Sequence, residues 1–183
     1  KYHTQMVASG RFVNDSMGGY IAKQTVKRLL VAGNRSAVQE RRQKNGVENG
    51  EKSGGAFAHG DESALQTFGN LRVLVMGFTY KENVSDIRNT KVADIVYELK
   101  SYGIDVDVID PKAGAHEVAE EYGIEMASAA SGVYNAVILA VPHTEYRALK
   151  ADDFASLMVE GGLFVDIRGI RREMEGHFRY WSL

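Results

Sequence analysis

The sequence predicts an α/β fold in which a doubly wound parallel sheet is preceded by a helix. Three observations indicate it: short apolar runs that end at glycine or proline, helical periodicity in the segments between them, and the regular alternation of the two. Strands that alternate with helices are typical of parallel sheets with right-handed crossovers. We therefore expect a binding site at the carboxyl ends of the strands.

The composition describes one soluble globular domain with an appendage, and it excludes several function classes. The 183 residues carry a net charge of −2, which indicates no basic surface for nucleic acid, and no run approaches the roughly 18 apolar residues of a membrane span. Because there is no cysteine, the chain itself supplies no disulfide, zinc-thiolate site or cysteine nucleophile. It begins at Lys1 without a leader pattern, so we expect a piece of a longer, cytoplasmic protein.

Residues 12–32 predict a helix, which Asn14, Asp15 or Ser16 can cap. Its broad apolar surface is formed by Met17, Tyr20, Ile21, Val26, Leu29 and Leu30. We expect no other part of the chain to cover this surface, so the helix is expected to self-associate. Residues 33–70 are rich in glycine and charge and predict a flexible linker or insertion, to which we assign no function.

From Leu71 onward the sequence alternates between strand and helix patterns. Residues 72–77 form an apolar run that is typical of an interior strand buried on both faces. Residues 92–99 repeat apolar side chains at helical spacing, and residues 104–109 alternate as expected of a strand with one buried face. The later expected elements are a helix at 114–122, a strand at 136–141, a helix at 151–159 and a strand at 163–167.

The loop after the first strand is the first candidate site. Residues 77–90 contain no G-x-G-x-x-G fingerprint and place bulky side chains where the pyrophosphate of a dinucleotide needs bare backbone. Instead, Tyr80 offers an aromatic ring, Lys81 a point cation and Arg88 a forked cation. These types suit a base or ribose and phosphate oxygens. A solvated loop without a ligand is the alternative interpretation.

Two further loops carry candidate residues. Arg168 lies beside a glycine at a strand end, where its fork suits a diphosphate, whereas Arg171 and Arg172 are expected in a solvated helical turn. His143 lies close to Glu145, a pair that suggests acid–base chemistry. Without a visible nucleophile, however, His143 is expected to be a loop or helix-start residue.

Asp110 ends a predicted strand and precedes Pro111, so we interpret it as a turn-forming residue. Arg88 can pair with Asp110 as well as with Asp86. The histidines show no metal-ligand spacing on one helix or strand, and we expect no metal site. They are His3, His59, His116, His143 and His177.

Residues 77–90, GFTYKENVSDIRNT, resemble the carboxyl-terminal domain of the UDP-glucose/GDP-mannose dehydrogenase family. The resemblance also covers residues 2–3, 10–18, 91–111, 139–146 and 166–169. Residues 10–18 look like the start of the family's central connecting helix. Residues 33–70 depart from the family, which has a short connection there.

The resemblance implies three parts: the end of a central helical, dimerisation domain at residues 1–32, a linker or insertion at 33–70, and a Rossmann-like UDP-binding domain at 71–183. It implies that the parent protein is an NAD-dependent nucleotide-sugar 6-dehydrogenase of polysaccharide biosynthesis, which oxidises the C6 alcohol of a UDP-sugar to a carboxylate. The sequence of residues 87–92 looks closer to the branch of the family that acts on UDP-N-acetylhexosamines than to the UDP-glucose branch.

The family's catalytic cysteine, catalytic lysine and NAD fingerprint all precede the matched region. The resemblance therefore implies that this chain holds no catalytic residue and is inactive by itself, and that it forms a homodimer through its first helix. Two other hypotheses stay open: a non-catalytic nucleotide-binding or regulatory module, and a self-sufficient dehydrogenase with an unconventional dinucleotide site.

Four residues are matched to family positions. Tyr80 and Lys81 match an aromatic–lysine pair that meets the nucleotide sugar, and Arg168 matches a basic residue that meets its diphosphate. Arg88 matches an arginine that reaches the NAD cofactor from this domain. We therefore expect the first three to bind substrate and Arg88 to bind cofactor.

Overall fold

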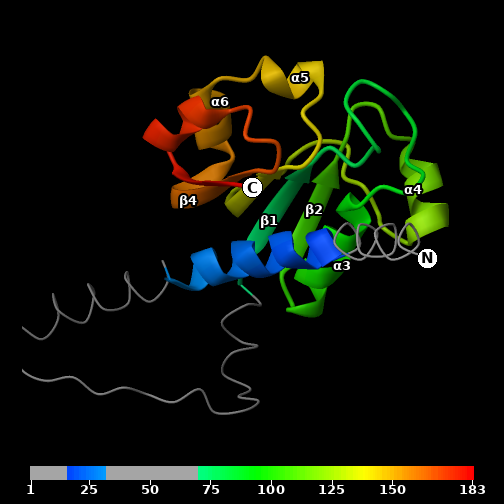
Figure 1. The fold of residues 1–183 in the computed structure, drawn as a ribbon, viewed down its shortest axis with the longest axis horizontal. Helices are drawn as coiled ribbons and strands as arrows, with labels where there is room; N and C mark the ends of the chain where they lie inside the picture. The colour runs from blue at the N-terminus through cyan, green and yellow to red at the C-terminus, as the bar shows by residue number, and fades with distance from the viewer. Residues whose placement is uncertain (1–15, 32–69) are drawn as a thin grey trace, which may run out of the picture.

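The computed structural model describes residues 16–31 and 70–183, which contain a five-stranded parallel sheet in the order β2-β1-β3-β4-β5 (Figure 1). The strands are β1 (Arg72–Met76), β2 (Asp105–Ile109), β3 (Tyr134–Leu139), β4 (Met158–Asp166) and β5 (Arg179–Ser182). A helix covers residues 16–31, and the others are α3 (Val92–Ser101), α4 (Ala115–Tyr122), α5 (Thr144–Arg147), α6 (Ala151–Ser156) and the 3-10 helix η1 (Arg172–Gly176). The chain passes from β1 to β2 on one side and then to β3, β4 and β5 on the other, which confirms the predicted doubly wound fold.

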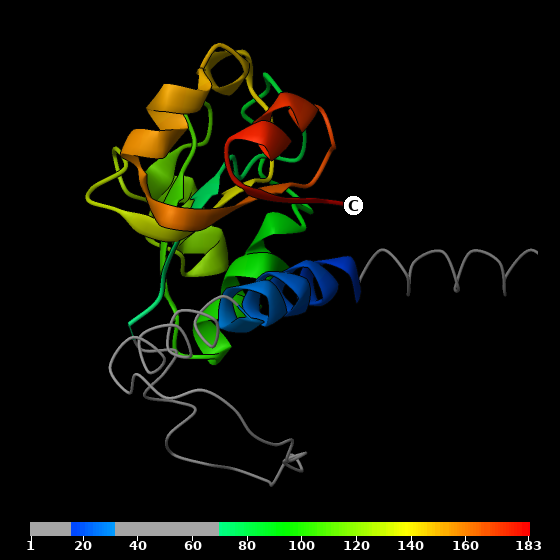
Figure 2. The ribbon, with the colours of Figure 1, turned by 90° about the vertical axis from the view of Figure 1, so that its left-hand side faces the viewer.

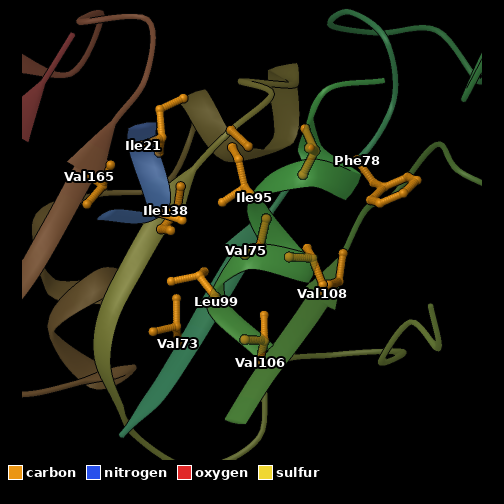
Figure 3. Packing of buried hydrophobic residues seen from close by; sticks show 14 of the residues in the cluster. Ile21, Val73, Val75, Phe78, Ile95, Leu99, Val106, Val108, Ile138 and Val165 are labelled. Carbon is orange, nitrogen blue, oxygen red and sulfur yellow. The ribbon is translucent and has the colours of Figure 1, made fainter. Parts of the chain in front are cut away.

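Alternate residues of the strands build a core on each face of the sheet. On β1, Val73 and Val75 join the cluster formed with α3 and the helix over residues 16–31 (Figure 3). Leu74 and Met76 join the cluster formed with α5, α6 and η1 on the opposite face. The helix over residues 16–31 lies beside α3, away from the helices of the second face (Figure 2). β1 is therefore buried on both faces, as predicted.

The helix over residues 16–31 packs against its own domain, so the expectation that nothing in the chain covers it is wrong. Ile21, Val26 and Leu29 are buried in the first cluster. Gly18 allows this packing, because a Cβ atom at this position would lie only 2.5 Å from the Cβ of Asp94 on α3. The argument for self-association from an uncovered apolar stripe therefore loses its basis.

The same helix is also attached to β5, a strand that the sequence patterns did not predict. The guanidinium of Arg28 lies 4.5 Å from the centre of the Trp181 ring, and Arg179 donates to the carbonyl oxygen of Arg28. β5 was missed because its four residues, Arg-Tyr-Trp-Ser, contain no apolar run and are only half-buried. Their pairing with β4 identifies the strand.

The predicted helix at 151–159 and strand at 163–167 require a correction. α6 ends at Ser156, and β4 already begins at Met158, which pairs with Tyr134 of β3. The register then shifts, and regular pairing resumes at Leu163. Phe154 and Met158 share the core at helical spacing, which explains why the sequence pattern extended the helix too far.

The remaining predicted elements agree with the structure to within about two residues. Residues 12–15 and 32 of the predicted helix, and residues 33–69 of the predicted linker, lie outside the described residues. Within the two described ranges, no helix has the length and apolar character needed to cross a membrane.

Candidate functional site

A cavity of about 490 Å³ opens at the carboxyl ends of β1, β3 and β4. Residues that follow these strands line it, together with the start of α3 and the first turns of the helix over residues 16–31. β1 and β3 are neighbours, and the chain leaves them toward opposite edges of the sheet. The cavity therefore lies at the reversal of strand order, where open α/β sheets bind ligands.

The three predicted substrate-binding residues, Tyr80, Lys81 and Arg168, all line this cavity. The Tyr80 residue is 62% exposed and the Arg168 side chain 55% exposed, so both groups are accessible from solvent. Within the described parts of the chain, no hydrogen bond or ion pair engages the ammonium group of Lys81. The geometry thus brings two cations and one aromatic ring together from loops that are far apart in the sequence.

The lining of the cavity is apolar as well as cationic. Apolar residues line it from three elements: Met17 and Ile21 from the helix over residues 16–31, Val92 and Ile95 from α3, and Ile167 from the loop after β4. A few charged groups among apolar side chains are typical of small-molecule sites. The cavity suits a ligand that combines an uncharged ring with phosphate groups.

Glu82 joins two arginines beside the cavity, a feature that the sequence analysis missed. One carboxylate oxygen of Glu82 lies 3.6 Å from Arg147 and the other 3.8 Å from Arg168. These long ion pairs are partly exposed and contribute little to stability. They do keep the guanidinium of Arg168 close to the loop that carries Lys81.

Arg88, the predicted cofactor-binding residue, is separated from the other three. Its Nε and Nη2 both donate to the carboxylate of Asp86, each at 2.9 Å, which decides between the two partners that the sequence left open. Arg88 hydrogen bonds lower the pKa of Asp86 to about 2. Both residues line another cavity, of about 610 Å³, together with three glutamates of α4: Glu117, Glu120 and Glu121.

Asp110 forms the predicted turn and does considerably more. One carboxylate oxygen accepts the backbone N–H groups of Lys112 and Ala113, at 2.6 and 3.0 Å. The other accepts those of Phe78 and Thr79, at 2.5 and 3.1 Å, from the loop after β1. Burial raises the pKa of Asp110, but the hydrogen bonds lower it further, so the net pKa lies below the ordinary value of 3.8. Asp110 therefore joins the ends of β1 and β2.

His143 directly precedes α5, as expected of a helix-start residue, but its side chain is fully buried. Its Nδ1 accepts the backbone N–H of Asn83 at 2.9 Å, and its Nε2 lies 3.0 Å from a carboxylate oxygen of Asp110. Asn83 adopts a left-handed backbone conformation with φ of 61°, which asparagine tolerates well. No pattern along the sequence signals this contact, because it joins residues 60 positions apart.

Arg171 does not lie in the solvated turn that we expected. It directly precedes η1, at the helical turn that we predicted, but only 7% of the residue is exposed, and its guanidinium donates to the backbone carbonyls of Tyr146 and Leu149. Arg172, by contrast, is exposed. The adjacent arginines therefore have different roles, and Arg171 is a structural residue.

The loop after β1 does not fit the pyrophosphate of a dinucleotide in the usual manner. Gly77 packs closely against the loop after β3, so that a Cβ atom on residue 77 would lie 2.5 Å from the carbonyl oxygen of Val141. The N–H groups of Phe78 and Thr79, which would face a phosphate, already donate to Asp110. In the described part of the chain, no group of three or more His, Asp or Glu residues is arranged to hold a metal ion.

Residues 74–173 match the model of the UDP-glucose/GDP-mannose dehydrogenase family, UDP binding domain. The chain is 35% identical over 179 residues to UDP-N-acetyl-D-glucosamine 6-dehydrogenase of Pseudomonas aeruginosa. This alignment covers 97% of the chain and 35% of the relative. It is 32% identical over 168 residues to the protein of the same name from Salmonella typhi, in an alignment that covers 91% of the chain and 32% of the relative. The chain thus spans about a third of the length of these relatives.

The fold also has counterparts among solved structures. The UDP-N-acetyl-mannosamine dehydrogenase Cap5O from Staphylococcus aureus matches all of this chain and 34% of its own, with a TM-score of 0.61 and 20% sequence identity. At that identity, the match supports the fold alone.

Proposed function

Because the chain belongs to the UDP-glucose/GDP-mannose dehydrogenase family, we propose that the cavity at the carboxyl ends of β1, β3 and β4 holds the UDP part of a UDP-sugar. In this proposal the parent protein uses NAD to oxidise the C6 alcohol of the sugar to a carboxylate. The observation that carries the proposal is the convergence of Tyr80, Lys81 and Arg168 on one cavity.

Each of the three residues has a role that follows from its chemistry. Lys81 supplies a point charge and Arg168 a planar fork, and together they neutralise the diphosphate. The exposed ring of Tyr80 offers a surface for the uracil or the ribose. The apolar lining excludes water from part of the site, which strengthens the interaction between the cations and the phosphates.

The cofactor is assigned mainly to a part of the parent protein that this chain does not contain. The loop after β1 lacks the glycine fingerprint, and the backbone N–H groups of Phe78 and Thr79 in this loop already donate to Asp110. Two nitrogens of Arg88 bond to Asp86, which fixes the plane of the guanidinium, and we assign the third, Nη1, to NAD. The misfit of the loop also disfavours a self-sufficient dehydrogenase, and the dehydrogenase relatives disfavour a regulatory module.

The sugar is assigned to the UDP-N-acetylhexosamines, since two relatives are named for UDP-N-acetyl-D-glucosamine. Residues 71–183 are assigned to the UDP-binding domain, and residues 1–32 to the end of a central helical domain. A homodimer through this helix, a cytoplasmic location and a role in polysaccharide biosynthesis stay predictions.

Calorimetric titration of the chain with UDP tests the proposal. We expect UDP to bind, and we expect Lys81→Ala and Arg168→Ala each to weaken binding by about tenfold or more, because each removes a charge-assisted contact with phosphate. Matched controls are Lys100→Ala on α3 and Arg172→Ala on η1, which are both exposed and are not among the residues that line the cavity. A chain that does not bind UDP, or controls that weaken binding equally, would contradict the proposal.

The chain alone is expected to be catalytically inactive. It contains no cysteine to form a covalent intermediate and no glycine fingerprint for NAD. Incubation with NAD and a UDP-N-acetylhexosamine is therefore expected to produce no NADH, as followed by its absorbance. Steady NADH formation by the purified chain would show that a different dinucleotide site exists in it.

A further inference from the structure

The loop that carries Lys81 is attached at both ends to the same histidine ring. In this Lys81 loop, residues 79–83, the backbone N–H of Asn83 donates to Nδ1 of His143 at 2.9 Å. At the other end, Oγ1 of Thr79 lies 3.2 Å from Nε2 of His143. Tyr80, Lys81 and Glu82 are thus carried between two attachment points on one buried imidazole.

The hydrogen bonds determine where the proton of this ring lies. Nδ1 accepts an N–H and so carries no proton, which places the proton of the neutral imidazole on Nε2. That proton faces Oδ2 of Asp110 at 3.0 Å and the hydroxyl oxygen of Thr79. Asp110 in turn accepts backbone donors from two loops, so the ring is held in one orientation.

Thr79 extends this network to the backbone of Lys81. Thr79 is buried, and its hydroxyl group donates to the carbonyl oxygen of Lys81 at 3.0 Å, so the hydroxyl oxygen accepts from His143. Asp110 and Thr79 therefore share the single Nε2 proton of His143, and the hydroxyl of Thr79 extends this network to the backbone of Lys81. Lys81 itself is exposed and lines the cavity.

From this geometry we infer that Asp110, His143 and Thr79 are positioning residues that hold Lys81 in place for the diphosphate of the ligand. This inference rests on the proposed function. His143 is too deeply buried to contact the ligand, and within the described residues its ring nitrogens are already engaged, so its effect on binding passes through the Lys81 loop. The same arrangement leaves no role for it as an acid or base.

A double-mutant cycle on UDP affinity tests this inference. Thr79→Val removes the hydroxyl at nearly constant volume, and His143→Gln retains a donor near the Nε2 position but loses the acceptor for Asn83. Each is expected to weaken UDP binding by about tenfold in the unchanged chain. In the Lys81→Ala background, where no ammonium group remains to be positioned, each is expected to change the affinity by less than about twofold.

Thr79→Ser is the matched control, because it keeps the hydroxyl group and is expected to bind UDP within about twofold of the unchanged chain. If His143→Gln does not fold, as circular dichroism would show, the comparison of Thr79→Val with Thr79→Ser decides the question alone. Equal tenfold losses with and without Lys81, or no loss at all, would overturn the inference while leaving the proposed function intact. No UDP binding by the unchanged chain would overturn both.

Discussion

Asp110→Asn is expected to lower the free energy of unfolding by about 3–5 kcal/mol. The side chain is fully buried, and each carboxylate oxygen accepts at least two backbone N–H groups. Whichever way the new carboxamide is turned, its NH2 group faces N–H donors instead of accepting from them. Two buried donors are then left without an acceptor, and the loops after β1 and β2 lose their connection.

Urea unfolding followed by circular dichroism measures this effect. Asp105→Asn is the matched control, since Asp105 begins β2 whereas Asp110 directly follows its other end, and since the Asp105 side chain, which pairs with Arg72, is 63% exposed. We expect this control to be much less destabilised. Equal losses in the two variants would show that the buried hydrogen bonds of Asp110 contribute no more than a surface charge.

In Asp110→Asn, the free energy of unfolding is expected to depend less strongly on pH in the acid range than in the unchanged chain. The pKa of Asp110 in the folded chain lies below its ordinary value of 3.8, so its stabilising effect is complete above about pH 4 and is lost as the pH falls through the folded pKa. Asp86, with a pKa of about 2, contributes in the same window and remains in the variant. The free energy of unfolding of Asp110→Asn is therefore expected to fall less steeply below pH 4, but still to fall.

Arg171→Met is expected to cost about 3 kcal/mol of stability. The guanidinium donates at 3.0 Å to the carbonyl of Tyr146 and at 2.7 Å to that of Leu149, and it also bonds to Glu173. Methionine fills much of the volume but leaves both carbonyls without a donor in the core beside the Phe154 ring. The connection between α5 and η1 is expected to weaken as a result.

Arg172→Met provides the comparison, because Arg172 is the exposed neighbour of Arg171 and begins η1. Its unfolding midpoint in guanidinium chloride is expected to stay close to that of the unchanged chain. If the two variants unfold at the same midpoint, the hydrogen bonds of Arg171 do not stabilise the fold.

The convergence of Tyr80, Lys81 and Arg168 was predictable because it depends on a property of all parallel sheets. The carboxyl ends of all parallel strands lie at one edge, so residues that follow β1 and β4, which are separated only by β3, can meet there without any knowledge of their contacts. The resemblance to a family then selected these residues from others in the same loops. The structure places all three on one cavity, whereas Arg88 lies on another.

The residues that support the site were not predictable in the same way. Asp110 and His143 each have an ordinary local explanation, a turn before proline and a helix start, and both explanations are correct. What makes them important is a contact between residues 33 positions apart in the sequence. No periodicity records such a contact, since it depends on how two loops pack.

The sequence by itself determined the order of the first four strands and of α3, α4 and α6, and the position of the binding edge, because these follow from local periodicity and from the geometry of parallel strands. Only the tertiary structure decided which polar groups are buried and what covers each apolar face. Arg171 is buried while Arg172 is exposed, and the helix over residues 16–31 packs against α3 at Gly18. The physical reason is that burial depends on neighbours brought together by the whole fold, whereas helix and strand periodicity depends on residues that are close along the chain.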